Sequence, residues 1–273
     1  MKNVVFDNIN LTVLKIGGSC LTYKKEGIRK IRKGFLDNLA KSIKNRKDNY
    51  PLVIAHGGGS ITHPLFDRYK ITDSFKNGKV DSPKEKVSAA RIHLAMSMLD
   101  KAVVKCFLDW GIPAWPIKTS VICPLSRGRV RNFYSDVIKL AIKKGFVPVI
   151  HGDVAFDYEF SNAIFSGDLA ACLVAKELKA SRIFFASDVE GVYLSDPKLV
   201  GKKRMIKRID NIDFLSKIET GEQFDHSGGM TAKLDYIRKY CKNIEAVVFN
   251  GLKKENFRKV FDGEKIGTII NFQ

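Results

Sequence analysis

Seven short apolar runs, rich in β-branched and aromatic residues, recur along the 273-residue chain. Runs of this length between turn-forming segments predict buried β-strands. The predicted strands cover residues 11–16, 52–55, 112–117, 146–150, 182–186, 246–249 and 268–271.

Segments of helical length and period lie between most of these runs. The predicted helices cover residues 29–45, 84–110, 134–144, 168–178, 229–242 and 254–261. Because strand and helix alternate, the pattern predicts an α/β fold with a mainly parallel sheet and helices on both of its faces.

The predicted helix over residues 84–110 carries apolar residues nearly all round its surface. This pattern favours a buried helix, or a partly buried helix at the seam of a dimer. We expect its two methionines, Met96 and Met98, in the core, and the lining of an apolar ligand pocket is the alternative.

Four glycine-bearing turns, at residues 15–19, 56–63, 166–168 and 227–233, lie where apolar strands give way to helices or further turns. Glycine backbone can bring its N–H groups against an anion, and a helix N-terminus adds positive charge there. Ligands collect beyond the carboxyl ends of parallel strands. We therefore expect these turns at one edge of the sheet, around a multiply charged ligand such as a nucleotide.

Length and composition favour a single two-lobed domain over residues 1–273, since 45% hydrophobic residues suffice for one sizeable core. No apolar stretch reaches the roughly 20 residues of a membrane span, and the N-terminus lacks the apolar run of a secretory signal. We expect a soluble protein of the cytoplasm.

Basic residues dominate the charge. Lysine and arginine number 47 against 29 acidic residues, and the formal net charge of +18 favours an anionic partner. The basic residues form short scattered clusters, such as residues 30–33 and 201–204, rather than an aromatic-interleaved face. Solvated helix faces and loops explain these clusters better than nucleic-acid binding as the main role.

The five cysteines are widely spaced and form no Cys-x-x-Cys pair. This spacing favours reduced structural thiols. A catalytic thiol is the weaker alternative, because no cysteine shares a turn with a histidine or an aspartate.

Neither a G-x-x-x-x-G-K-[ST] loop nor a G-x-G-x-x-G fingerprint occurs, so other residues must bind phosphates. Lys15 ends a predicted strand just before Gly17 and Gly18, where its ammonium can reach an anion held by the backbone. Lys24 can return across the same turn, or it belongs to an exposed charged run.

Three consecutive glycines follow His56, and ordering them costs conformational entropy that a plain surface loop seldom needs. His63 closes this loop. The loop contains no cysteine or carboxylate to complete a metal site with the two histidines. A histidine that donates to a bound phosphate is therefore favoured over a zinc ligand, and a buried structural histidine is the alternative.

Two aspartates and a last glycine turn complete the candidate chemistry. Asp168 opens a predicted helix, where it can cap the helix or hold two lysines in place. Asp188 follows a predicted strand and fits a ribose contact or a turn. Gly228, Gly229 and Lys233 predict a second anion site, or a plain helix entry with an exposed lysine.

In this order along the chain, these motifs resemble the amino acid kinase superfamily. They are Lys-Ile-Gly-Gly-Ser from Lys15, His-Gly-Gly-Gly-Ser from His56, Ser-Gly-Asp from Ser166, Asp-Val-Glu-Gly-Val-Tyr from Asp188, Ser-Gly-Gly-Met from Ser227 and Asn-Gly-Leu-Lys from Asn250. The position of His63 and the strand end at residues 150–153 are most similar to the isopentenyl phosphate kinases, and the loop also resembles the fosfomycin kinases.

The resemblance implies a three-layer αβα sandwich and a homodimer. It implies that residues 1–180 form a lobe for the acceptor, and residues 181–273 a lobe for ATP, which carries Mg²⁺. The implied activity is ATP-dependent phosphorylation of isopentenyl phosphate, or of a similar small phosphorylated acceptor, in isoprenoid biosynthesis. Fosfomycin or another small phosphonate is the alternative acceptor, and a non-enzymatic anion-binding relative is the least favoured alternative.

The resemblance also implies roles for single residues. Lys15, Lys24 and Asp168 would be catalytic, with the two lysines as cations at the transition state. Gly58, His63 and Gly167 would bind the acceptor. The implied ATP-binding residues are Lys15, Gly17, Gly18, Ser19, Gly59, Asp188, Gly228, Gly229 and Lys233, and none is expected to bind a metal directly.

Two motifs depart from the family pattern. The usual Ser-Phe-Gly-His reads Ser-Ile-Thr-His at residues 60–63, and the usual Asp-x-Thr-Gly-Gly-Met reads Asp-His-Ser-Gly-Gly-Met at residues 225–230. Because Thr62 stands where the family has a glycine, we expect it to change the direction of the His63 imidazole. This change would affect the binding of the acceptor more than the binding of ATP.

Overall fold

The computed structural model describes residues 10–23, 30–69, 82–195, 204–211 and 229–273. Two predicted site residues, Lys24 and Gly228, lie outside the described residues.

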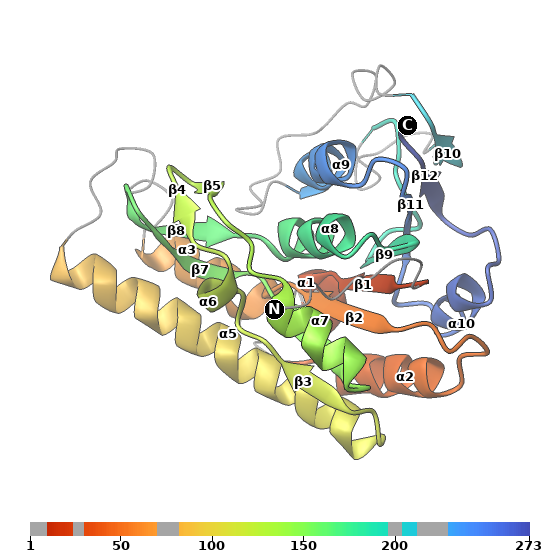
Figure 1. Cartoon of the computed structure of the whole chain (residues 1–273), viewed down its shortest axis with the longest axis horizontal. Coiled ribbons are helices and arrows are strands. Elements are labelled where there is room, and N and C mark those ends of the chain that lie inside the picture. Colours follow the sequence, from red (N-terminus) through yellow and green to blue (C-terminus); the bar gives the residue numbers. More distant parts are fainter. Residues whose placement is uncertain (1–9, 24–29, 70–81, 196–203, 212–228) are drawn as a thin grey trace.

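An eight-stranded sheet runs through the described chain, with helices on both faces (Figure 1). Every neighbouring pair of strands is parallel except β11 and β12. The strands lie in the order β10 (Arg208–Ile209), β12 (Thr268–Ile270), β11 (Glu245–Asn250), β9 (Arg182–Ser187), β1 (Thr12–Ile16), β2 (Leu52–His56), β6 (Val147–His151) and β3 (Ala114–Pro116). The predicted α/β class and the mainly parallel sheet are confirmed.

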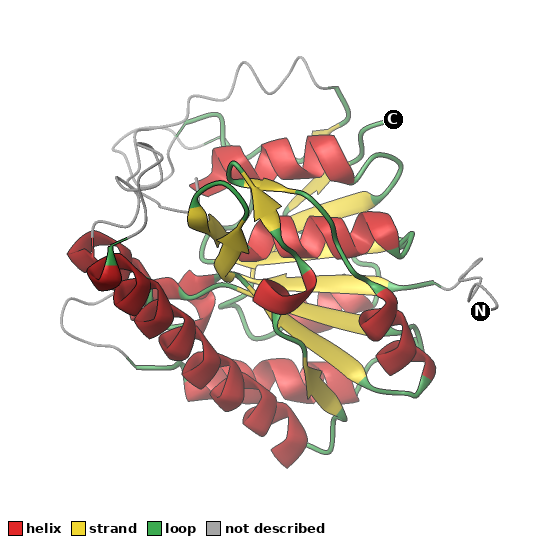
Figure 2. Ribbon diagram, turned by 60° about the vertical axis from the view of Figure 1, so that its left-hand side comes forward, coloured by secondary structure: helices red, strands yellow, loops and turns green. Residues whose placement is uncertain are grey.

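Alternate residues of each central strand enter two separate cores, because successive side chains point to opposite faces of a sheet. In β1, Leu14 packs against α2 (Lys33–Lys44), α5 (Pro83–Asp109) and α10 (Asn256–Phe261). On the other face, Val13 belongs to the core with α7 (Asp136–Lys143), α8 (Gly167–Glu177) and α9 (Gly229–Tyr240). The result is three layers, seen from a second side in Figure 2.

A second, four-stranded sheet was not predicted. It consists of β5 (Arg129–Val130), β4 (Leu125–Ser126), β7 (Asp153–Asp157) and β8 (Ser161–Phe165). Two of these strands have only two residues, too short to carry a pattern, and the antiparallel β7 and β8 form a hairpin directly after β6. The sequence analysis also missed short helical turns at α1 (Gly18–Leu21), η1 (Gly59–Ile61), α3 (His63–Tyr69) and α6 (Thr119–Ile122).

The helix α5 is buried on one side only. It begins with a capping box between Ser82 and Glu85, and Met96 is 2% exposed in the core. Met98, however, is 66% exposed, so its predicted place in the core is wrong. Full burial of this helix is also wrong, since an apolar stripe of its surface faces outward; its exposed members are Val87, Leu94, Met98 and Leu108.

The eight-stranded sheet is shared between the two predicted lobes. Strands β1, β2, β6 and β3 come from residues before 180, and β9, β11, β12 and β10 from residues after it. The two halves meet where β1 pairs with β9. The assignment of acceptor to one half and ATP to the other stays a prediction.

Candidate active site

The carboxyl ends of the central strands lie side by side. In the parallel register, Ile16 at the end of β1 pairs with His56 of β2 and with Ala186 of β9, and His56 pairs with His151 of β6. The segments that follow these strands therefore start at one edge of the sheet, where ligands of parallel α/β folds bind.

The turns after β1 and β2 are in direct backbone contact. A Cβ added to Gly18 would lie 2.3 Å from the backbone nitrogen of Gly59. Gly59 has φ +53°, and a Cβ there would lie 2.4 Å from the carbonyl oxygen of Gly18. Glycine is required at both positions, because any side chain would force the two turns apart.

Thr22 joins the same two turns through its hydroxyl. Its Oγ1 donates to the carbonyl oxygen of Gly18 at 2.9 Å and accepts from the backbone N–H of Ser60 at 2.9 Å. The hydroxyl of Ser60 is itself buried and has no hydrogen-bond partner among the described residues. A polar group in this position is available to a ligand in the loop.

Asp168 binds two lysines that are far apart in the sequence. Its Oδ1 lies 2.7 Å from the Lys15 ammonium and 2.8 Å from the Lys233 ammonium, and all three side chains are at least nine-tenths buried. Burial alone raises the pKa of Asp168, but the two ammonium groups outweigh it and lower that pKa to about 2. The carboxylate is therefore ionised at neutral pH and holds both lysines beside the sheet edge.

Asp168 does not cap its helix. Ser166 is the N-cap of α8, and its side chain accepts from the backbone N–H of Leu169 at 3.1 Å. Gly167 lies against the end of β2, since a Cβ there would be 2.5 Å from the carbonyl oxygen of His56. The start of α8 is thus placed beside the triple-glycine loop, which leaves the carboxylate of Asp168 for the two lysines.

On the β9 side, Ser19 donates from its hydroxyl to Asp188 Oδ1 at 2.9 Å. This bond ties the turn after β1 to the segment after β9. The sequence analysis named both residues but did not pair them, because nothing in a separation of 169 residues signals a contact. Gly229, with φ +57°, opens α9, and Lys233 projects from that helix to Asp168.

His63 begins α3 directly after the loop, with its ring 6.2 Å from the ring of Phe66. Thr62 is buried, and a Cβ on Gly58 would lie 1.8 Å from Thr62 Oγ1. The residue that departs from the family pattern therefore packs on the glycine predicted to bind the acceptor. Within the described ranges, His, Cys, Asp and Glu side chains form no group of three or more that would suit a metal ion.

The cysteines have the properties of structural thiols. All five are free, and all except Cys106 are buried. Burial raises the pKa of Cys20 and of Cys123 to about 12, and that of Cys106 to about 11. Thiols with such pKa values hold little thiolate at neutral pH, which disfavours a catalytic cysteine.

The arrangement defines a class of protein: a three-layer α/β fold with glycine turns at one sheet edge and two buried lysines on one carboxylate. The chain belongs to the amino acid kinase family, whose model matches residues 10–250. An isopentenyl phosphate kinase of Methanocaldococcus jannaschii is 34% identical over 96% of this chain and 99% of its own length. An isopentenyl phosphate kinase of Methanothermobacter thermautotrophicus is 28% identical over 95% of this chain and 98% of its own.

Solved structures agree with these relatives. A crystal structure of an isopentenyl phosphate kinase superposes with a TM-score of 0.82 at 26% identity, covering 96% of this chain and all of the other. A UMP kinase of Bacillus anthracis superposes with a TM-score of 0.65 at 17% identity, which shows the shared fold alone. In the part of the chain that the structure describes, no helix is both long and apolar enough to cross a membrane.

Proposed function

We propose that this protein is a cytoplasmic kinase that transfers the terminal phosphoryl group of ATP to isopentenyl phosphate, giving the diphosphate. The observation that carries the proposal is the contact of Lys15 and Lys233 with one oxygen of Asp168, beside two glycine turns in backbone contact. The isopentenyl phosphate kinases that match nearly the whole chain support the choice of acceptor.

In this proposal the turn after β1, the last glycine of the triple-glycine loop and the start of α9 bind ATP, and the rest of that loop and the start of α8 bind the acceptor. The ATP-binding residues are Lys15, Gly17, Gly18, Ser19, Gly59, Asp188, Gly228, Gly229 and Lys233. The acceptor-binding residues are Gly58, His63 and Gly167. Lys15 and Lys24 act as cations on the transferred group, and Asp168 positions Lys15 and Lys233.

The reaction needs charge neutralisation more than it needs a base. A phosphate monoester is already ionised at neutral pH, since its second pKa is about 6. Two anionic phosphates must then approach each other while charge spreads over the oxygens of the transferred group. Preorganised lysines lower that cost without reorganising during the reaction.

Mg²⁺ is proposed to arrive with ATP. This ion is usually held by one or two carboxylates together with substrate phosphates. The sequence predicted no direct ligand, but the Asp188 carboxylate and the Ser19 hydroxyl, hydrogen-bonded to each other at the ATP turn, are oxygen donors of the suitable kind. Bound there, the ion would supply further positive charge to the phosphates.

We also propose that the protein is a homodimer that pairs through the exposed apolar stripe of α5. Val87, Leu94, Met98 and Leu108 recur along this helix at near-heptad spacing and are each more than half exposed. A second copy that presents the same stripe would bury all of them symmetrically.

A coupled ADP-release assay over a panel of acceptors tests the function. We expect turnover with isopentenyl phosphate, and much less with fosfomycin, carbamate or amino acid carboxylates. Preference for fosfomycin would instead favour the phosphonate kinase alternative. The packing of Thr62 on Gly58 would then explain the change of acceptor. Tight oxyanion binding without ATP turnover on any acceptor would refute a kinase.

A further inference from the structure

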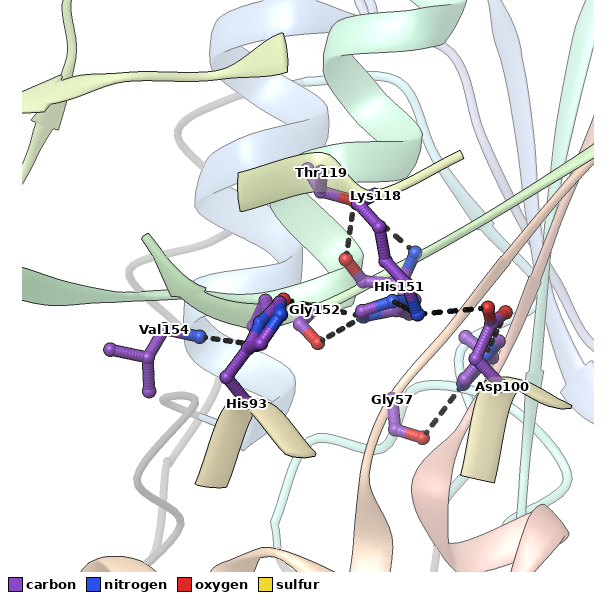
Figure 3. A network of polar contacts seen from close by, with 10 residues as sticks. Gly57, His93, Asp100, Lys118, Thr119, His151, Gly152 and Val154 are labelled. Atoms are coloured by element: carbon purple, nitrogen blue, oxygen red, sulfur yellow. Dashed lines mark hydrogen bonds and ion pairs between the residues drawn. The ribbon is translucent and has the colours of Figure 1, made fainter. Parts of the chain in front are cut away.

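A second buried polar network lies beside the predicted acceptor turns (Figure 3). We call it the interior network; it consists of His56, Asp100, Lys118, His151, Asp153 and His93. Asp100 is its centre: Oδ1 lies 3.2 Å from His56 Nε2, and Oδ2 lies 3.3 Å from the Lys118 ammonium. That ammonium also lies 3.4 Å from His151 Nε2.

The network continues outward to the surface of α5. His151 Nδ1 lies 4.0 Å from Asp153 Oδ2, which is 2.7 Å from Nδ1 of the half-exposed His93. The backbone N–H of Val154 donates to the other oxygen of Asp153 at 2.8 Å. Asp153 therefore has partners of its own and does not compete with Asp100 for Lys118.

Asp100 is a charged group in the interior. The side chains of His56, Asp100 and His151 are at most 2% exposed, and that of Lys118 is 33% exposed. Burial alone raises the pKa of Asp100, but its bond to His56 and the charges of His56, His151 and Lys118 lower it overall. A buried carboxylate of this kind holds its partners firmly, because an unpaired charge in the interior is costly.

These partners are connected directly to the acceptor turns. The carbonyl oxygen of His56 accepts from the backbone N–H of Gly152 at 3.0 Å, and the next residue along the chain begins the triple-glycine loop. A Cβ on Gly167 would lie 2.5 Å from that oxygen, and a Cβ on Gly152 would lie 2.6 Å from the nitrogen of Gly167. With contacts this close, a shift of His56 displaces the loop, Gly152 and Gly167 together.

We propose that Asp100 is a positioning residue for the acceptor: by holding His56 and Lys118 it sets the backbone of the triple-glycine loop and of Gly167. This inference rests on the proposed function, in which these glycines bind the acceptor phosphate. The ATP turn is anchored elsewhere, since the backbone N–H of Gly17 donates to the carbonyl of Ala186 on the opposite side of β1. The triple-glycine loop still touches that turn through Gly59 and Gly18, so we expect Asp100 to act mainly on the acceptor and only weakly on ATP.

The test is Asp100→Asn, which keeps the shape of the side chain and leaves Lys118 without its carboxylate. Because hydrogen bonds to charged groups are the strong ones, we expect KM for isopentenyl phosphate to rise about tenfold, while KM for ATP changes by less than about twofold. The matched control is Asp136→Asn, the same substitution in an exposed pair with Lys139 on α7, which should change neither KM.

Two further variants separate positioning from stability. Val103→Ala removes packing from the fully buried face of α5 and should lower the melting temperature with both KM values unchanged. Lys118→Met removes the ammonium but leaves Asp100 bound to His56, so it should fold and raise KM for the acceptor by a smaller factor. Equal rises in both KM values, or unchanged KM values in Asp100→Asn, would overturn the proposal.

A second measurement does not depend on the acceptor. In protein labelled with ¹⁵N-glycine, Asp100→Asn should shift the amide signals of the triple-glycine loop, Gly152 and Gly167, and leave that of the distant Gly263 in place. Unmoved loop signals would overturn the positioning role. Absence of turnover on isopentenyl phosphate by the unaltered protein would instead overturn the proposed function, and the glycine signals would still decide the role of Asp100.

Discussion

At the scale of single residues, one carboxylate oxygen organises the charge of the site. Asp168 holds Lys15 and Lys233 within 2.7 and 2.8 Å, although these lysines come from opposite ends of the chain. With two cations on one carboxylate, the cluster keeps a net positive charge for a phosphate. Burial lowers the pKa of Lys233, and Asp168 opposes that effect.

Replacement of Lys15 tests this arrangement. Lys15→Ala should lower kcat about 10²-fold or more, as expected for the loss of a preorganised group at the transition state. The fold should persist, because Asp168 keeps its pair with Lys233. Steady-state kinetics and thermal unfolding measure the two effects, and Lys47→Ala, at an exposed lysine after α2, is the control. Activity close to that of the unaltered protein would show that Lys15 does not act on the transferred group.

The buried His151 gives a prediction about pH. Burial, with the nearby charge of His56, lowers its pKa from 6.5 to about 4. Between these values the unfolded chain binds a proton that the folded protein does not, so the free energy of unfolding falls as the pH drops. The shift corresponds to about 3 kcal/mol.

His151→Asn removes this titration. Urea unfolding at several pH values between 7 and 4 should therefore show a smaller loss of stability in the variant than in the unaltered protein. An identical dependence on pH in the two proteins would mean that His151 is protonated equally in the folded and the unfolded state.

At the scale of elements, the two glycine turns restrict each other. The turns after β1 and β2 meet at Gly18 and Gly59, and the hydroxyl of Thr22, just after α1, bonds to both turns. Neither turn can change its conformation independently, because the backbone of each turn packs directly against the backbone of the other. The loop before α3 is thus ordered by packing as well as by any ligand it binds.

Gly59→Ala measures this restriction. The methyl group would need φ +53° and would lie 2.3 Å from Thr22 Oγ1, so we expect a loss of stability beyond the roughly 1 kcal/mol of the backbone conformation alone. Gly145→Ala is the matched control, since Gly145 also has positive φ but nothing lies within 4 Å of its Cβ. Chemical unfolding of both variants should give the larger loss for Gly59→Ala, and equal losses would show that the turns can separate freely.

At the scale of the whole molecule, an exposed apolar stripe runs along α5 on one face of the sheet. The opposite face of the sheet is covered by α7, α8 and α9, and α8 is almost wholly buried. Exposed apolar residues aligned on one long helix are typical of an interface.

Light scattering of the purified protein should give twice the mass of one chain. The double variant Leu94→Glu with Met98→Glu should be monomeric, because four like charges would meet across a symmetric interface. Leu140→Glu places a charge at a similarly exposed apolar position of α7, on the other side of the sheet, and should leave the dimer intact. A monomeric unaltered protein would refute the pairing through α5.

Much of the fold follows from local patterns. The central strands and longer helices were predicted within a few residues, because apolar runs and helical periodicity are patterns among residues close together in the sequence. The four-stranded sheet was missed, since β4 and β5 have two residues each, too short for any pattern, and join the rest of the sheet through the pairing of β4 with the distant β7. The sequence left open whether α5 is buried fully or on one side only, because an apolar surface looks the same in sequence whether a core or a partner covers it.

The sequence by itself determined the α/β class, the family through its ordered motifs, and the residue types of the site, since each glycine, lysine and aspartate belongs to a short local motif. Only the tertiary structure decided which of them meet. The pairing of Lys15, Asp168 and Lys233, of Ser19 with Asp188, and of Asp100 with His56 and Lys118 joins distant segments. Such contacts arise from the order of strands in the sheet, which no local pattern contains.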